Sequence, residues 1–155
     1  MRPRANGADE PDSPAQLKAR ALRLLARREH SRAELARKLA PRAESAAALE
    51  RLLDELAHNK QLSDERYAEA RAHRLARKYG VARIVHDLRA KGVAEHTAAS
   101  ATAGASADEI GRAREILRRK YALPATTLEE RARRARFLQS RGFSHEVIRR
   151  VVIIG

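Results

Sequence analysis

A turn that recurs at nearly equal spacing is the feature that most constrains how this chain can fold. Each copy begins at a leucine near the end of a helical pattern, and these leucines are 49 and 50 residues apart. The three copies are Leu39-Ala40-Pro41-Arg42-Ala43, Leu88-Arg89-Ala90-Lys91-Gly92-Val93 and Leu138-Gln139-Ser140-Arg141-Gly142-Phe143. Repetition at such a period is typical of stacked helical units, none of which can bury its apolar face alone. We therefore predict an all-α fold, a tandem repeat of three-helix units with about nine helices, elongated and curved.

Hydrogen-bonding residues mark where the helices should begin. Ser13, followed by Pro14 and Gln16, predicts an N-cap with proline at the first helical position. A capping box pairs a Ser or Thr side chain with a Glu three residues later, and each satisfies the other's backbone N–H. Such boxes are predicted at Ser31–Glu34, Ser106–Glu109 and Thr127–Glu130. Ser63 predicts the start of a long fourth helix.

Apolar residues at helical spacing indicate the buried faces. The leucines of residues 44–58 predict a third helix that buries one leucine-rich side. The fourth helix is expected to run to Tyr79 and to close at Gly80, whereas Gly92 and Gly142 end later helices with a left-handed residue. Residues 94–106 are a run of Ala, Ser and Thr that predicts a weaker sixth helix.

A large positive charge is distributed along the chain. The 155 residues include 33 Lys and Arg against 20 Asp and Glu, a net charge of +13. We expect a disordered lead over residues 1–12, with a net charge of −1. Three repeats are expected at residues 13–61, 62–106 and 107–155, and their net charges are +5, +3 and +6 in that order. A folded body charged along its length repels itself, so a polyanion is its natural partner.

Several classes of protein are disfavoured by what the sequence lacks. There is no Cys, and the six His do not follow zinc-binding spacings, so we expect no metal site. No phosphate-binding loop or nucleophile elbow occurs, which predicts a protein that is not an enzyme and needs no cofactor or catalytic residue. The apolar runs are too short to cross a membrane, which favours a cytoplasmic protein without membrane contact. Aromatic residues make up 3%, so any stacking on bases would come from arginine.

Basic residues on helix faces and near the recurring turns are the candidate contacts. The triplet Arg77-Lys78-Tyr79 is echoed 42 residues later by Arg119-Lys120-Tyr121. Arginine can bind phosphate or carboxylate through two hydrogen bonds, although any single residue of this kind is more often part of a solvated helix face. The candidate contacts to DNA or to a protein filament are Lys38, Arg42, Arg71, Arg74, Lys78, Arg89, Lys91, Arg118, Arg119, Lys120, Arg133, Arg134 and Arg141.

The order of motifs resembles the RecX regulatory proteins over nearly the whole chain. The resemblance rests on Ser31-Arg32-Ala33-Glu34-Leu35, Leu62-Ser63-Asp64-Glu65-Arg66-Tyr67-Ala68, Lys78-Tyr79-Gly80 and Phe137-Leu138-Gln139-Ser140-Arg141-Gly142-Phe143, together with the second turn. One departure is Ala43, which stands where the family pattern has glycine. The resemblance implies a three-helix-repeat fold without a catalytic site, which binds the RecA filament on DNA and inhibits strand exchange and coprotease function.

The expected partners are therefore the RecA filament and single-stranded DNA, with double-stranded DNA as a further option, and the expected oligomeric state is a monomer. The alternative is a helical DNA-binding protein that acts independently of RecA, either nonspecifically or by reading a sequence with a short helix in the major groove. Basic residues outnumber the Asn and Gln that read bases, and they position a protein on DNA more than they specify a site.

Overall fold

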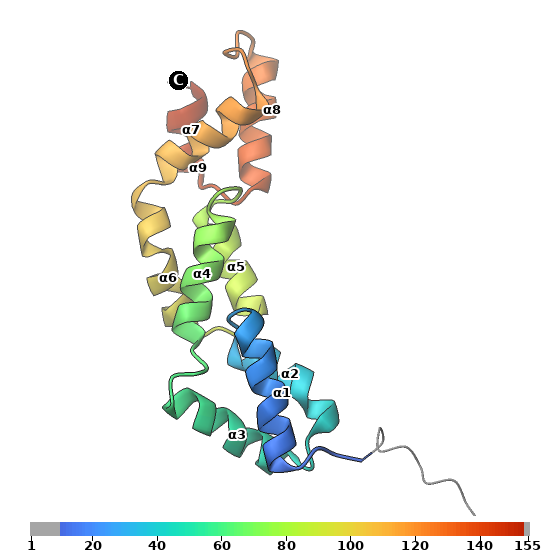
Figure 1. Cartoon of the computed structure of the whole chain (residues 1–155). Coiled ribbons are helices and arrows are strands. Elements are labelled where there is room, and N and C mark those ends of the chain that lie inside the picture. Colours follow the sequence, from blue (N-terminus) through green and yellow to red (C-terminus); the bar gives the residue numbers. More distant parts are fainter. Residues whose placement is uncertain (1–9, 154–155) are drawn as a thin grey trace, which may run out of the picture. The chain divides into compact units, whose positions relative to one another are not determined.

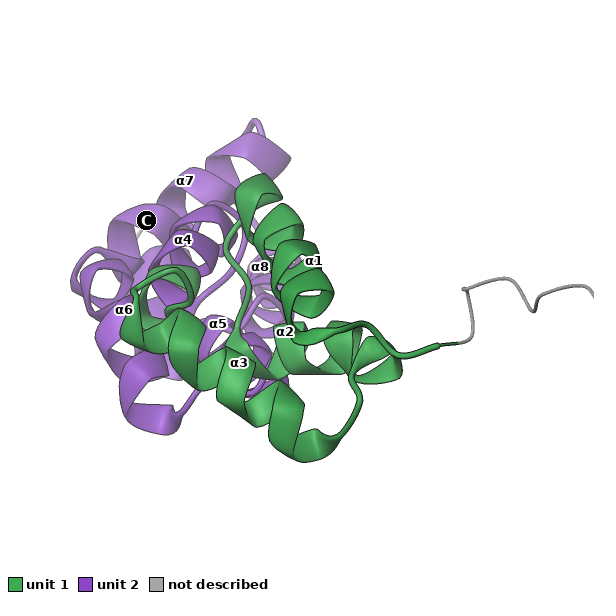
Figure 2. Cartoon of the chain, turned by 60° about the horizontal axis from the view of Figure 1, so that its bottom comes forward, with its two compact units in different colours: residues 1–67 green, residues 68–155 purple. Residues whose placement is uncertain are grey.

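The chain is helical throughout the part that the computed structural model describes, residues 10–153 (Figure 1). Nine α-helices and two short irregular helical segments occur in this range, which contains no strand. The prediction of an all-α chain is confirmed. The chain divides into two compact units, Met1–Tyr67 and Ala68–Gly155 (Figure 2). Most of the predicted disordered lead, residues 1–9, lies outside the described residues.

Unit 1 contains three helices around a leucine core. These are α1 (Pro14–Arg27), α2 (Arg32–Leu39) and α3 (Ala46–His58), with a 3₁₀ turn η1 (Ala40–Arg42) after α2. Helix α4 (Asp64–Leu75) begins in this unit and continues into unit 2. The core consists of side chains that are at most 8% exposed: Leu17, Ala21, Leu35, Leu39, Leu49, Leu52, Leu53, Leu56 and Leu62. The leucine face predicted for the third helix is therefore buried as expected.

Asp12 is a buried carboxylate that joins the start of the chain to unit 1. It accepts hydrogen bonds from Arg20 and Arg42, and its backbone N–H donates to the Arg42 carbonyl at 2.7 Å. The two guanidinium groups hold the pKa of Asp12 below its usual value. The sequence placed Asp12 in a disordered lead, because a sequence pattern does not reveal ion pairs with residues eight and thirty positions away.

Glu34 forms a second buried ion-pair cluster in unit 1. Its carboxylate is paired with Arg28 and lies 3.6 Å from the Lys38 ammonium. The Arg28 hydrogen bonds lower the pKa of Glu34 from 4.5 to about 2. The Ser31 hydroxyl caps α2 by accepting a hydrogen bond from the Glu34 N–H at 3.1 Å. The Glu34 carboxylate, however, accepts from Arg28 and does not complete a capping box with the Ser31 N–H. The predicted capping box is thus only half formed.

Unit 2 holds the remaining helices in two groups. The first is α4 with α5 (Val81–Ala90) and α6 (Glu95–Ala107). The second is α7 (Glu109–Lys120), α8 (Leu128–Ser140) and α9 (His145–Ile148), which continues into the π-helical segment η2 (Arg149–Ile153). The second group has a continuous apolar core: Ala113, Ile116, Leu117, Leu138, Phe143, Val147, Ile148, Val151 and Val152.

Three expected helix boundaries are different in the structure. The third helix begins at Ala46, after Ser45 as its cap, rather than at residue 44. Helix α4 ends at Leu75, and Gly80 is the N-cap of α5 instead of the end of α4. The box at Ser106–Glu109 is wrong because the alanine-rich α6 continues through Ala107. Glu109 instead accepts the backbone N–H of Val81 at 3.0 Å.

The second and third recurring turns have the same hydrogen bonds. Val93 donates to the Leu88 carbonyl at 3.0 Å, and Phe143 donates to the Leu138 carbonyl at 3.2 Å. Gly92 and Gly142 have φ angles of 85° and 90°, as the left-handed position of this helix end requires. The first turn lacks this geometry, since Pro41 continues into the 3₁₀ turn η1 and Ala43 is extended.

Backbone contact between Gly80 and the third turn joins the two helix groups of unit 2. The Gly80 N–H donates to the Arg141 carbonyl at 2.7 Å, and Arg83 donates to the Ser140 carbonyl at 2.9 Å. A Cβ atom on Gly80 would lie under 3.0 Å from the backbone of Gly142 and Phe143. Glycine at position 80 is therefore required by space rather than by its φ of −79°.

Gly80→Ala should destabilise the protein, whereas Gly104→Ala should not. Alanine at 80 forces two backbone segments apart, and such overpacking costs about 1–3 kcal/mol. Position 104 lies within α6 with nothing within 4 Å of an added Cβ, so alanine there should stabilise by about 0.5–1 kcal/mol. Urea unfolding of both variants measures the two effects. If the two variants are equally stable, the close contact between Gly80 and the third turn is contradicted.

Glu34→Gln should reduce stability at neutral pH and lose its effect in acid. The folded-state pKa is depressed, so the carboxylate stabilises the fold above about pH 4.5 and that contribution is lost as the pH falls toward 2. We expect a difference on the order of 2 kcal/mol at neutral pH that shrinks to near zero at low pH. Thermal unfolding over a pH series measures it, with exposed Glu44→Gln as the control. A difference that does not change with pH would count against the ion pair.

Candidate polyanion interface

Three of the predicted contact residues have their charge engaged inside the fold. Arg42 pairs with Asp12, and Lys38 lies against Glu34 and donates toward His30 Nε2 at 3.1 Å. Arg71 pairs with Asp87 and joins α4 to α5, which lowers the pKa of the Asp87 carboxyl. These cations stabilise the fold, so we remove Lys38, Arg42 and Arg71 from the candidate interface.

Five cations of unit 2 gather around two aromatic rings. They line an open hollow of about 470 Å³ together with Ile116, and no carboxylate lines it. We call this set the basic–aromatic cluster: Arg77, Lys78, Arg119, Lys120 and Arg141 with Tyr79 and Phe137. Lys78, Arg119, Lys120 and Arg141 were predicted, and Arg77 was not. A lining in which every charged side chain is a cation favours anionic ligands such as phosphate groups.

Aromatic rings and backbone carbonyls orient the cluster's cations. The Lys120 ammonium lies 4.1 Å from the Phe137 ring centroid, and the Arg141 guanidinium lies 5.1 Å from it. Arg119 donates to the Arg77 carbonyl at 2.7 Å. Tyr121 packs edge-to-face on Phe137, with ring centroids 6.2 Å apart. Cations held in this way lose less side-chain entropy on binding than free ones do.

The repeated Arg-Lys-Tyr triplet was the sequence signal for this site. Residues 77–79 and 119–121 are 42 residues apart in the chain, yet the Arg119 side chain bonds to the Arg77 backbone. Arg83 adds a further cation that the prediction missed, with its guanidinium 4.2 Å from the Tyr79 ring centroid. It lies one turn into α5, where no periodic pattern distinguishes it from other surface arginines.

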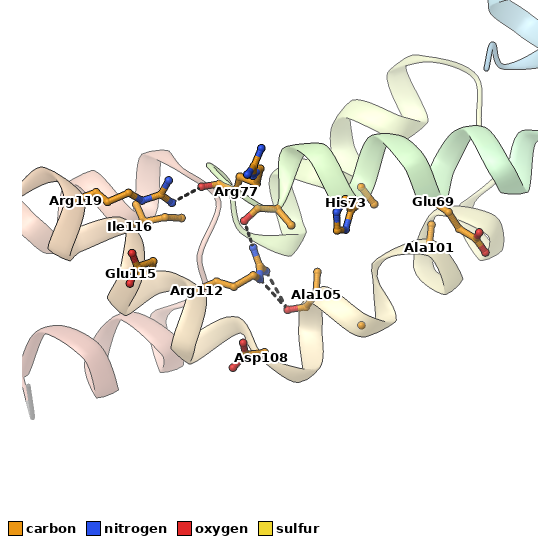
Figure 3. Close-up of a pocket in the computed structure, with 13 residues that line it drawn as sticks. Glu69, His73, Arg77, Ala101, Ala105, Asp108, Arg112, Glu115, Ile116 and Arg119 are labelled. Atoms are coloured by element: carbon orange, nitrogen blue, oxygen red, sulfur yellow. Dashed lines mark hydrogen bonds between the residues drawn. The ribbon is translucent and has the colours of Figure 1, made fainter. Parts of the chain in front are cut away.

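Arg112 joins α7 to the segment between α4 and α5 and to the last turn of α6. Its guanidinium donates to the carbonyls of Ala76 and Tyr79 at 2.8 and 2.7 Å, and to the Ala105 carbonyl at 3.0 and 3.2 Å. Burial lowers the pKa of Arg112. Figure 3 shows its side chain reaching across from α7, near the Arg119–Arg77 hydrogen bond. Carbonyls in the last turn of a helix and in the segment after it lack partners within the helix, and this one side chain bonds to those of Ala76, Tyr79 and Ala105.

A second hollow borders the cluster but has a different character. It measures about 620 Å³ and shares Arg77, Ile116 and Arg119 with the cluster. Its lining includes four alanines, and it carries Glu69, Asp108 and Glu115 beside the arginines (Figure 3). A lining of mixed charge does not favour a polyanion.

The other predicted contacts lie outside the cluster. Arg74, Arg89 and Arg133 are exposed, and Lys91 is partly buried. Arg118 pairs with Glu115 on α7 at 3.0 Å. Arg134 donates to the Leu123 carbonyl at 2.6 Å and lies 4.5 Å from the Tyr121 ring centroid. The structure thus brings four of the thirteen predicted residues together in the cluster.

The histidines and carboxylates form no arrangement typical of a metal centre. Within residues 10–153, no three or more His, Asp or Glu side chains are grouped to hold an ion. His30 is buried beside the Arg28 carbonyl, 3.0 Å from its Nδ1, and burial lowers its pKa. None of the helices in this part of the chain has both the length and the apolar character needed to cross a bilayer.

Comparison with known proteins identifies all three helical segments. Residues 18–56, 63–101 and 107–152 match the models of the first, second and third three-helix domains of RecX. The chain is 48% identical over 139 residues to "Regulatory protein RecX" of Herbaspirillum seropedicae, covering 90% of each chain. It is 41% identical over 132 residues to the protein of that name from Neisseria meningitidis, covering 85% of this chain and 86% of that protein. The crystal structure of RecX from Lactobacillus salivarius has the same fold, with a TM-score of 0.80 and 18% identity over 91% of this chain and 95% of that chain.

Arg112→Met should destabilise the protein far more than Arg114→Met on the same helix. Methionine leaves the carbonyls of Ala76, Tyr79 and Ala105 without this donor, a loss of about 2–3 kcal/mol. Arg114 is exposed, so its replacement should change stability by less than about 0.5 kcal/mol. Urea unfolding monitored by circular dichroism gives both values, and similar values for the two would rule out the bridging role.

Proposed function

The chain belongs to the RecX family of regulatory proteins, and from this membership we propose that it binds the RecA–DNA filament and inhibits its recombinase, ATPase and coprotease activities. Through that inhibition it modulates DNA repair and the SOS response. The single observation that supports this proposal best is the basic–aromatic cluster, a hollow lined by five cations and no carboxylate.

The cluster fits the sugar–phosphate backbone of DNA. The charged groups of Arg119, Lys120 and Arg141 are held by a ring or a carbonyl, so these three present charge at defined positions along the hollow. Phosphate contacts of this kind provide affinity without reading bases. A regulator that must act wherever RecA has assembled needs affinity that does not depend on sequence.

Inhibition then follows from occupancy. A chain bound to the filament's DNA hinders filament extension, nucleotide turnover or access by the repressor, because the bound protein and the incoming component need the same space. The alternative is a helical DNA-binding protein that acts independently of RecA. In that case the same cluster would bind DNA, but the chain would not change RecA's activities.

The triple variant Lys78→Ser/Lys120→Ser/Arg141→Ser should bind single-stranded DNA and inhibit RecA much more weakly. We expect an affinity loss of about tenfold to a hundredfold between about 50 and 200 mM salt. The slope of log K against log salt should fall by about two, because each lost phosphate contact removes about 0.7. The measurement is a titration of RecA's ATPase on single-stranded DNA, together with DNA binding by fluorescence anisotropy.

The control Arg23→Ser/Arg37→Ser/Arg51→Ser removes the same charge from exposed positions on α1, α2 and α3. It should change affinity by no more than about twofold at the higher salt. Equal losses in the two triple variants would refute the cluster as the interface. If the unaltered protein leaves RecA's ATPase and strand exchange unchanged at stoichiometric ratios, the RecA proposal is wrong, and retained DNA binding would then support the alternative.

A further inference from the structure

Two leucines stand almost fully exposed beside the loop that joins α7 to α8. Leu123 is 76% exposed and Leu128 is 81% exposed, and they are the exposed large hydrophobic side chains of residues 10–153. The core of unit 2 does not use them, although apolar side chains elsewhere in its second helix group are buried. A pair of leucines left open in one short segment is a candidate contact surface.

The segment is nevertheless held in one conformation by its own hydrogen bonds. Arg134 donates to the Leu123 carbonyl at 2.6 Å. The Glu130 carboxylate accepts from the backbone N–H of Thr126 at 2.7 Å and of Thr127 at 3.3 Å, and the Thr127 hydroxyl accepts from the Glu130 N–H. The predicted Thr127–Glu130 capping box is thus confirmed, and it fixes the start of α8, where Leu128 is the first residue.

The surface next to Leu123 is apolar and positively charged. Leu123 and Pro124 line a hollow of about 300 Å³ together with Val151 and Val152. Its charged lining residues are Arg114, Arg118 and Arg134, and no carboxylate lines it. Because Glu130 is occupied by the cap, its charge is directed into the loop backbone rather than toward this hollow.

We propose that residues 122–128 and this hollow, which we call the leucine loop, form a docking surface for a protein with an apolar pocket bordered by carboxylates. Leucine offers a nucleic acid neither a hydrogen bond nor a stacking ring, so the exposed pair favours a protein partner. The arginines favour an acidic one. A second copy of this chain is disfavoured because it would bring the same positive charge against itself.

The inference rests on the proposed function and assigns filament binding to two surfaces of the chain. The basic–aromatic cluster contacts DNA phosphates, and the leucine loop contacts the protein part of the filament. Because the loop is already ordered, docking requires little further loss of backbone entropy, and the buried leucine area contributes directly to affinity.

Leu123→Ser/Leu128→Ser should weaken binding to RecA filaments without weakening binding to DNA. The full-length chain, labelled with a fluorophore, is titrated with single-stranded DNA and separately with RecA filaments assembled on the same DNA. We expect at least about a tenfold loss on filaments and no more than about a twofold change on DNA alone. Leu123→Met/Leu128→Met keeps the apolar area and should bind both like the unaltered protein. Leu123 and Leu128 are both exposed, so neither double variant should change the thermal unfolding temperature.

The outcomes separate the inference from the proposed function. If the unaltered protein binds filaments more tightly than DNA and the serine variant does the same, the leucine loop is not the docking surface and the proposed function stands. If the unaltered protein binds filaments no more tightly than DNA alone, the inference fails, and the effect of the unaltered protein on RecA's ATPase and strand exchange decides the proposed function separately. The inference is also overturned if the serine variant loses as much affinity for DNA alone as for filaments. It is overturned as well if the chain binds phosphatidylserine vesicles, or a second copy of itself, through the two leucines.

Discussion

The satisfaction of helix ends is the constraint on which this fold depends. Its helices are short, at most 14 residues, so a large share of their backbone groups lies in the first and last turns without partners inside the helix. Side-chain caps such as Ser13 and Thr127 supply some of the missing bonds locally. In unit 2 the remaining bonds come from distant residues: Glu109 accepts from Val81, and Arg112 donates to carbonyls beyond α4 and within α6. The same bonds that complete one helix thereby fix its neighbour.

This use of side chains divides the positive charge into two parts with different roles. Arg42, Arg71 and Arg112 are bound to carboxylates or carbonyls, and their removal would expose buried groups. The cations of the basic–aromatic cluster instead border a hollow with no carboxylate in its lining. A net charge of +13 is therefore a poor guide to the extent of an interface, because part of that charge maintains the fold. We therefore place the proposed interface where several cations border one hollow with no carboxylate in its lining.

Sequence reasoning succeeded where the determinants were local. The caps at Ser13 and Thr127, the leucine face of α3 and the left-handed glycines depend on residues within a few positions of one another. It failed where the partner lies far along the chain. Asp12 was assigned to a disordered lead although Arg42 binds it, and the carboxylate of Glu109 was assigned to its own helix although it caps α5. Likewise, the thirteen predicted contacts could not be separated into free and engaged cations, since that distinction depends on side-chain partners that only the packed structure brings close.

Composition did not reveal what the aromatic residues do in the fold. A content of 3% gave no support to a surface of base-stacking rings, and any stacking on bases was assigned to arginine. The structure gives the rings a different role. Phe137 has Lys120 and Arg141 near it, and Tyr79 has Arg83 at 4.2 Å, so each ring holds cations rather than bases. One ring can orient more than one cation, so a few aromatic residues suffice to give a whole basic surface a defined geometry. A surface built in this way binds phosphate with little reordering, and its affinity depends on the position of its rings as much as on the number of its charges.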